Sequence, residues 1–150
     1  MISASFFLPD LPAMDALGAR IAGALRTGDC VALAGDLGVG KTTLARAILQ
    51  SLGVREAIPS PTFTLVQSYE TSALRVRHYD LYRLEHAAEM DELGLDEALD
   101  EGAALIEWPE RAGGRLPDDA LMLKLSIEGQ GRRVKISGPP RWIEVFKDVR

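Results

Sequence analysis

The spacing of apolar residues predicts that the chain begins with a strand, a helix and a second strand. Residues 3–8 can form a short strand, and apolar positions then recur at helical spacing from Leu11 until Gly28. Asp10 stands where a helix N-cap is expected, and a glycine commonly ends a helix. Residues 29–35 form a short apolar run that is typical of a fully buried strand.

The pattern then changes from helical to strand periodicity. After a glycine-rich turn, apolar residues from Leu44 to Leu52 predict a second amphipathic helix that ends at Gly53. Residues 63–70 and 73–84 alternate apolar and polar positions on either side of a short Thr-Ser turn. This alternation predicts a β-hairpin in the middle of the chain.

The sequence from residue 89 onwards predicts short helices, another strand and a second hairpin. Residues 89–100 have the composition of one or two short acidic helices, and residues 103–106 are an apolar strand that leads into a carboxylate. Residues 120–138 alternate around a Gly-Gln-Gly turn and predict a second hairpin. We therefore expect a single α/β domain over residues 1–150, with a mixed sheet flanked by helices.

Charge and composition argue against several classes of protein, among them general nucleic-acid binders and membrane proteins. A net charge of -5 argues against a general nucleic-acid coat, which needs many Lys and Arg contacts to phosphates, although it leaves room for a local RNA contact. No apolar run approaches the roughly 20 residues of a membrane span, and the N-terminus lacks the pattern of a signal peptide. A single cysteine, Cys30, excludes an intramolecular disulfide and a multi-cysteine zinc site. A cytoplasmic protein that does not engage the membrane is expected.

A glycine-rich segment between the second strand and the second helix carries a phosphate-binding pattern. The stretch "GDLGVGKTT" at 35–43 matches GxxxxGK[ST] and has the strand before it and the helix after it that this loop requires. Lys41 is expected to face the β- and γ-phosphates, and Thr42 is expected to bind Mg²⁺. A glycine-rich turn that binds nothing is the alternative. The pattern with its context predicts binding of ATP or GTP.

Two carboxylates are candidates for the acidic partner of such a loop. Glu107 follows an apolar run, and Asp80 ends "RVRHYD", where alternation places His78 and Asp80 on one face of a strand. Each carboxylate also has a simpler interpretation, Glu107 as an exposed acid at a strand end and Asp80 as a surface ion pair with a neighbouring arginine. Both are retained as catalytic candidates beside Lys41.

A proline-flanked segment follows the loop-bearing helix. Residues 58–65, "IPSPTFTL", present the hydroxyls of Ser60 and Thr62 from a stiff backbone. Such a segment can act as a switch that senses the γ-phosphate, or it can be a loop without a special role.

Four stretches in order, "GDLGVGKTTLAR", "SPTFTLVQSY", "HYDLYRL" and "LIEWPER", give the chain a family resemblance. Over about residues 8 to 138 it resembles the bacterial TsaE (YjeE) family, the ATPase subunit of the machinery that makes threonylcarbamoyladenosine at position 37 of tRNA. The resemblance implies a P-loop NTPase-like fold, an ATP/ADP–Mg²⁺ site, and action on the TsaB–TsaD complex, which ATP hydrolysis would reset, so that contact with tRNA is indirect.

The resemblance also implies roles for individual residues. Glu107 joins Thr42 at the metal, Asp80 is required for turnover, and Trp108 lies beside the nucleotide. The residues implied to contact the nucleotide are Asp10, Leu11, Gly38, Val39, Gly40, Lys41, Thr42, Thr43, Trp108 and Arg132.

Two other functions compete with a partner-dependent ATPase. A small P-loop kinase would usually carry an arginine-bearing lid, yet no arginine stands between Arg83 and Arg111. A nucleotide-dependent scaffold with incidental hydrolysis would not need both Asp80 and Glu107. The ten acidic residues between Leu84 and Glu110 can form a docking face for a basic partner or a solvated helix surface.

Overall fold

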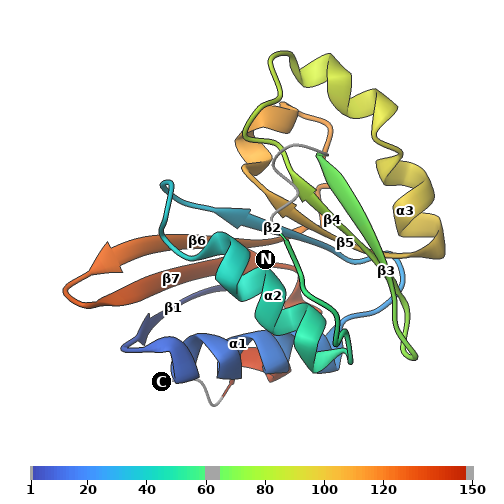
Figure 1. Cartoon of the computed structure of the whole chain (residues 1–150). Helices are drawn as coiled ribbons and strands as arrows, with labels where there is room; N and C mark the ends of the chain where they lie inside the picture. Colours follow the sequence, from blue (N-terminus) through green and yellow to red (C-terminus); the bar gives the residue numbers. More distant parts are fainter. Residues whose placement is uncertain (1, 60–64, 148–150) are drawn as a thin grey trace.

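A computed structural model of the chain describes residues 2–59 and 65–147. Its centre is a seven-stranded mixed sheet with the strand order β1-β7-β6-β2-β5-β4-β3 (Figure 1). The strands are β1 (Ile2–Leu8), β2 (Cys30–Ala34), β3 (Val66–Glu70), β4 (Arg75–Asp80), β5 (Gly102–Glu107), β6 (Leu121–Glu128) and β7 (Gly131–Gly138). The predicted fold class, an α/β domain with a mixed sheet, is confirmed.

The direction of the strands brings several strand ends to one edge of the sheet. β2 runs parallel to both β5 and β6, and β4 runs parallel to β5. β7, β1 and β3 add antiparallel pairs at the two sides. The carboxyl ends of β2, β5 and β4 therefore meet at the same edge, which is where ligands usually bind in sheets of this type.

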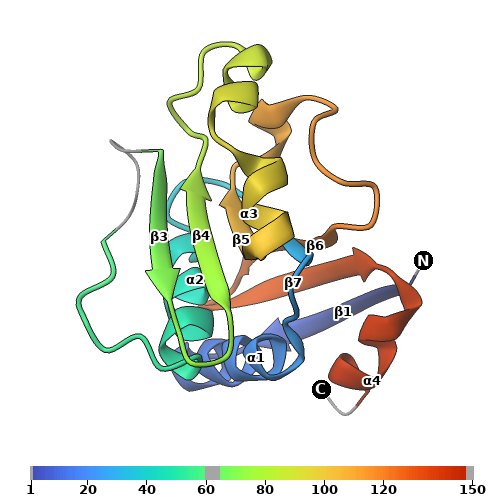
Figure 2. The ribbon, with the colours of Figure 1, turned by 90° about the vertical axis from the view of Figure 1, so that its right-hand side faces the viewer.

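Helices cover both faces of this sheet (Figures 1 and 2). α1 (Leu11–Ala24) and α2 (Lys41–Ser51) lie on one face, and α3 (Leu95–Glu101) lies on the other. The shorter elements are the 3₁₀ helices η1 (Ala87–Glu92), η2 (Pro109–Ala112) and η3 (Pro140–Trp142), and α4 (Ile143–Phe146). No helix within residues 2–59 and 65–147 combines the length and apolar character that crossing a membrane requires.

Alternation along the central strands divides the core in two. On β5, Ala103 and Leu105 pack with α1 and α2, whereas Ala104 and Ile106 pack on the opposite face with Tyr79. Every residue of β5 is buried, as expected for a strand covered on both faces. Packing on both faces therefore fixes the position of β5, and of Glu107 at its carboxyl end, relative to α2.

The contact between α1 and α2 is unusually close. A Cβ atom added to Gly18 would lie 2.5 Å from the Cβ of Ala47 and 3.0 Å from its carbonyl carbon. The two helices can approach this closely only because Gly18 has no side chain. The position of α2, which begins at Lys41, therefore depends on this glycine.

One predicted boundary is wrong. The pattern predicted a strand over residues 73–84, but β4 ends at Asp80. The side chain of Asp80 accepts a hydrogen bond from the Tyr82 amide (3.0 Å), and the Leu81 amide donates to the carbonyl of Glu107 (3.1 Å). These bonds turn the chain away from β3 although the apolar and polar residues continue to alternate.

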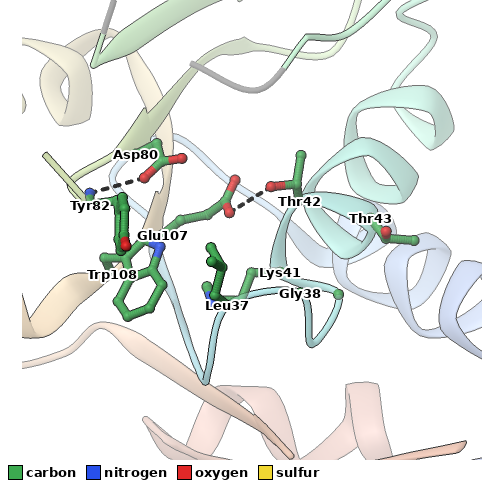
Figure 3. Close-up of a pocket in the computed structure, with 10 residues that line it drawn as sticks. Leu37, Gly38, Lys41, Thr42, Thr43, Asp80, Tyr82, Glu107 and Trp108 are labelled. Atoms are coloured by element: carbon green, nitrogen blue, oxygen red, sulfur yellow. Dashed lines mark hydrogen bonds between the residues drawn. The ribbon is translucent and has the colours of Figure 1, made fainter. Parts of the chain in front are cut away.

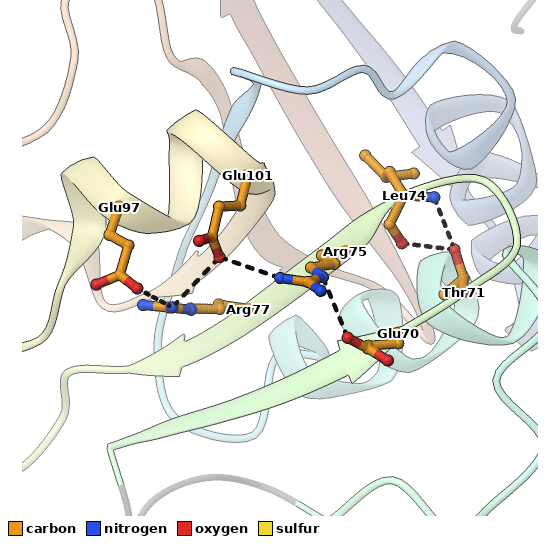
Figure 4. A network of polar contacts seen from close by, with 7 residues as sticks. All are labelled: Glu70, Thr71, Leu74, Arg75, Arg77, Glu97 and Glu101. Atoms are coloured by element: carbon orange, nitrogen blue, oxygen red, sulfur yellow. Dashed lines mark hydrogen bonds and ion pairs between the residues drawn. The ribbon is translucent and has the colours of Figure 1, made fainter.

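The acidic stretch predicted as one or two short helices forms η1 and α3, and part of it is ion-paired (Figure 4). Arg75 on β4 contacts Glu70 at 3.1 Å and Glu101 at 3.4 Å. Arg77 contacts Glu97 at 3.5 Å. Glu97 and Glu101 of the acidic stretch thus pair with arginines of β4, and these ion pairs connect α3 to the β3–β4 hairpin.

Candidate nucleotide-binding site

The loop between β2 and α2 follows a path that favours glycine. Gly35, Gly38 and Gly40 have φ angles of 139°, 80° and 117°. A Cβ on Gly35 would lie 2.5 Å from the carbonyl oxygen of Leu125, so no other residue fits there without a shift of the backbone. Gly40 caps α2 in the left-handed conformation, and the helix N-terminus therefore opens directly from the loop. A loop of this shape presents backbone N–H groups to an anion.

Lys41, the first residue of α2, lies inside the loop. Only 4% of its surface is exposed, and its Nζ donates to the carbonyl oxygens of Gly35 (2.5 Å) and Asp36 (2.9 Å). The ring of Trp108 covers the ammonium group at 4.0 Å from Nζ to the ring centroid. Burial lowers the pKa of Lys41, while nearby carboxylates, Glu107 foremost, act in the opposite direction. The loop therefore encloses a fixed cation.

Glu107 at the end of β5 links the loop-bearing helix to β4. Its Oε1 accepts a hydrogen bond from the hydroxyl of Thr42 at 2.7 Å (Figure 3). Its Oε2 lies 2.7 Å from Nε2 of His78. The carboxylate is 2% exposed, so its orientation is set by these two neighbours and not by solvent.

Asp80 lies beside Glu107, because the two residues are register partners at the ends of β4 and β5. It is 4% exposed, and Figure 3 shows its carboxylate turned toward the same space as that of Glu107. The interpretation of Glu107 and Asp80 as surface acids is wrong, because both are buried at the carboxyl edge of the sheet.

Trp108 adopts a conformation that is uncommon for a large side chain. Its φ and ψ are 60° and 51°, in the left-handed helical region, and Pro109 follows it at the start of η2. The indole packs against Tyr82 with the ring centroids 4.9 Å apart. The two rings form one wall of the space above Lys41 (Figure 3).

Two cavities adjoin the loop. The first, of about 280 Å³, is lined by Leu37, Gly38, Gly40, Lys41, Thr42, Thr43, Asp80, Tyr82, Glu107 and Trp108. The second, of about 380 Å³, is lined by Leu8, Pro9, Asp10, Leu11, Met14, Gly38, Val39, Gly40, Thr43, Gln130, Gly131 and Arg132. Gly38, Gly40 and Thr43 line both cavities, so the two cavities lie on either side of the loop.

The structure brings together most residues that the sequence singled out. Of the predicted residues, Gly38, Gly40, Lys41, Thr42, Thr43, Asp80, Glu107 and Trp108 line the first cavity, whereas Val39 lines only the second, together with Asp10, Leu11 and Arg132. Arg132 is held by a hydrogen bond from its Nε to the carbonyl of Val39 (2.8 Å). Ser60 and Thr62, the predicted switch residues, lie outside the described residues.

Sequence reasoning missed several residues of these cavities. Tyr82 and Leu37 line the first, and Met14 and Gln130 line the second. Tyr82 stands within the stretch "DLYRL", but the sequence predicted that residues 73–84 form a strand and gave Tyr82 no role in a site. Leu37 stands at a variable position of the loop pattern itself. Met14 and Gln130 carried no signal of their own, since only the fold brings them to the loop.

The oxygen ligands of the first cavity suit Mg²⁺. The hydroxyl of Thr42 and the carboxylate of Glu107 lie 2.7 Å apart, and Asp80 adds a second carboxylate to the same cavity. Among the described residues there is no cluster of three His, Cys, Asp or Glu side chains that could hold a metal ion alone. This arrangement fits Mg²⁺, which usually binds one or two carboxylates and completes its shell with substrate phosphates and water.

Comparisons with known proteins identify the family of this chain. The family model described as "Threonylcarbamoyl adenosine biosynthesis protein TsaE" matches residues 8–135. Proteins named tRNA threonylcarbamoyladenosine biosynthesis protein TsaE are similar to it in Rickettsia felis (40% identical, 79% of this chain and 70% of the relative) and in Streptomyces coelicolor (41%, 75% and 78%). A crystal structure of Bacillus subtilis YdiB superposes with a TM-score of 0.81 at 25% identity, covering 98% of this chain and 93% of that one. The chain belongs to the TsaE family.

Proposed function

We propose that this protein binds and hydrolyses ATP with Mg²⁺ in the biosynthesis of threonylcarbamoyladenosine on tRNA. The observation that carries the proposal is the contact between the Thr42 hydroxyl and Glu107 across the first cavity (2.7 Å). It joins the start of the phosphate-loop helix to the carboxyl end of β5, with Lys41 and Asp80 in the same cavity. The names of the relatives support the place of this chemistry in tRNA modification.

Six side chains of the first cavity have tasks in this proposal. The backbone amides of the loop and Lys41 bind the β- and γ-phosphates, which carry the charge that a buried ammonium can offset. Thr42 and Glu107 would hold Mg²⁺, which supplies charge neutralisation at the phosphate oxygens when bound. Asp80 orients the attacking water, and the rings of Trp108 and Tyr82 keep bulk water from that side.

The second cavity accommodates the rest of the nucleotide. It opens on the other side of Gly38 and Gly40 and combines the apolar side chains of Leu11 and Met14 with Arg132. Apolar walls with a few polar groups suit a purine and its ribose. We therefore place the base near Asp10 and Leu11, and Arg132 beside the nucleotide.

The proposal extends to partners. As in the family that the chain belongs to, it would act on the TsaB–TsaD complex in the cytoplasm, and its ATP hydrolysis would reset that complex between cycles. Contact with tRNA would then be indirect. The kinase alternative is less well supported, because the segment over β4 and β5 contains no arginine between Arg83 and Arg111.

The deciding experiment measures ATP hydrolysis with and without TsaB, TsaD and tRNA. We expect weak hydrolysis by the protein alone and stimulation by the partners. Glu107→Ala and Asp80→Ala should retain nucleotide and lose turnover, whereas Asp118→Ala, an exposed acid outside both cavities, should match the native protein. Normal partner-stimulated hydrolysis in both Glu107→Ala and Asp80→Ala would refute their proposed roles. Failure of every partner combination to stimulate would favour a kinase or a scaffold.

A further inference from the structure

His78 is a buried polar side chain that the mechanism above does not use. It lies on β4, is fully buried, and contacts Glu107 through Nε2 at 2.7 Å. Its other ring nitrogen, Nδ1, is buried and has no hydrogen-bond partner among the described residues. Leaving a buried polar atom unpaired costs about 1–3 kcal/mol, so an aliphatic residue would pack here at lower cost unless the ring served another purpose.

The surroundings of the ring assign its proton. A proton on Nδ1 alone would bring the lone pair of Nε2 against the Glu107 carboxylate. A proton on Nε2 avoids this problem, because Nε2–H then donates to Oε2.

This hydrogen bond completes the restraint on Glu107. Oε1 accepts from Thr42 on α2, and Oε2 accepts from His78 on β4, each at 2.7 Å. A carboxylate at the end of a strand could otherwise rotate about its side-chain bonds, and each rotation would move Oε1 away from Thr42. The ring of His78 is itself fixed, because it is enclosed in the sheet two residues before Asp80.

We propose that His78 is a positioning residue that holds the Glu107 carboxylate in the orientation needed beside Thr42. This inference rests on the proposed function and assigns His78 no contact with nucleotide. Outer residues that orient a metal-binding side chain are typically worth 10–100-fold in metal affinity or activity. We therefore expect a 10–100-fold loss in kcat, or an equal rise in the Mg²⁺ concentration for half-maximal activity, when the donor at Nε2 is removed.

The test compares two substitutions at His78 with a control on the same strand. His78→Leu removes the donor, whereas His78→Gln keeps an N–H group near the position of Nε2 and should restore kcat to within a few-fold of the native value. Val76→Ala is the control, because Val76 is buried on β4 in the core beneath α1 and α2 and should lower stability without lowering kcat. Affinity for ADP without Mg²⁺ should stay within about two-fold in all three. Native kcat and Mg²⁺ dependence in His78→Leu would overturn the proposal.

A second measurement does not depend on turnover or on the folding of a variant. Long-range ¹⁵N–¹H NMR of the native protein distinguishes the two neutral forms of a histidine ring and the imidazolium. A proton on Nε2 of His78 is expected, and a ring without a proton on Nε2 would overturn the inference. Absence of hydrolysis in the native protein with all partners would refute the proposed function instead, because the NMR result would stand.

Discussion

The close approach of α1 and α2 predicts opposite effects for two glycine substitutions in the same helix. Gly18→Ala places a Cβ 2.5 Å from the Cβ of Ala47, 3.0 Å from its carbonyl carbon and 3.1 Å from the amide nitrogen of Ile48. Two of these three atoms are backbone, so a change of side-chain rotamer cannot relieve the contact. Gly23→Ala meets no heavy atom within 4 Å and serves as the matched control.

The magnitudes follow from two opposing terms. Replacing a helical glycine by alanine stabilises a helix by about 0.5–1 kcal/mol, and this gain applies at both positions. Forcing extra atoms into a packed contact costs about 1–3 kcal/mol, and this cost applies at Gly18 alone. The free energies of unfolding of the two variants should therefore differ by about 2 kcal/mol. For a protein of this size, that difference separates the midpoints of thermal unfolding by roughly 4–8 °C.

Thermal and urea unfolding of the native protein and the two variants measure this difference. Gly23→Ala should match or exceed the native stability, and Gly18→Ala should fall below it. Because α2 begins at Lys41, Gly18→Ala should also weaken nucleotide binding, whereas Gly23→Ala should leave it unchanged. If Gly18→Ala proves as stable as Gly23→Ala, the helices do not pack as described and the reasoning fails.

Three further outcomes are expected. Lys41→Ala should abolish nucleotide binding in calorimetric titration, because it removes the cation enclosed by the loop; unchanged ATP affinity would contradict this. A nucleotide-dependent change in tryptophan fluorescence should vanish in Trp108→Phe and persist in Trp142→Phe, because Trp108 lines the first cavity and Trp142 is buried elsewhere. Burial raises the pKa of Cys30 to about 12, so at pH 8 about one thiol in 10⁴ is ionised. Cys30 should therefore be alkylated only when the protein unfolds. Rapid alkylation of the folded protein would contradict this, because it would show that the thiol is accessible.

Much of this fold could be predicted from local patterns. Alternation and helical spacing predicted strands and helices close to their observed places, because each pattern reports which faces are buried. The residues around the loop were predicted for a different reason: "GDLGVGKTT" needs special backbone angles, and Gly35, Gly38 and Gly40 indeed have positive φ. The roles assigned to Lys41 and Thr42 remain predictions that the experiments above test.

What escaped prediction depends on contacts between distant segments. The end of β4 at Asp80 is set by a side-chain hydrogen bond and by the pairing with β5, and neither interrupts the alternation that continues to Leu84. The contact between His78 and Glu107 requires the register of two strands that are 29 residues apart at this point. The second cavity forms because β1 pairs with β7, which brings Arg132 next to Leu8.

The backbone at Trp108 has a consequence for redesign of this protein. A residue other than glycine in the left-handed region costs of order 1–3 kcal/mol, and Trp108 holds this conformation at φ 60° with a ring over Lys41. Glycine at this position would relieve that backbone cost. The same change would uncover the ammonium of Lys41 and remove the partner of Tyr82. A relaxed backbone at this turn and a closed wall above Lys41 are thus alternatives, because only the side chain of Trp108 supplies that wall.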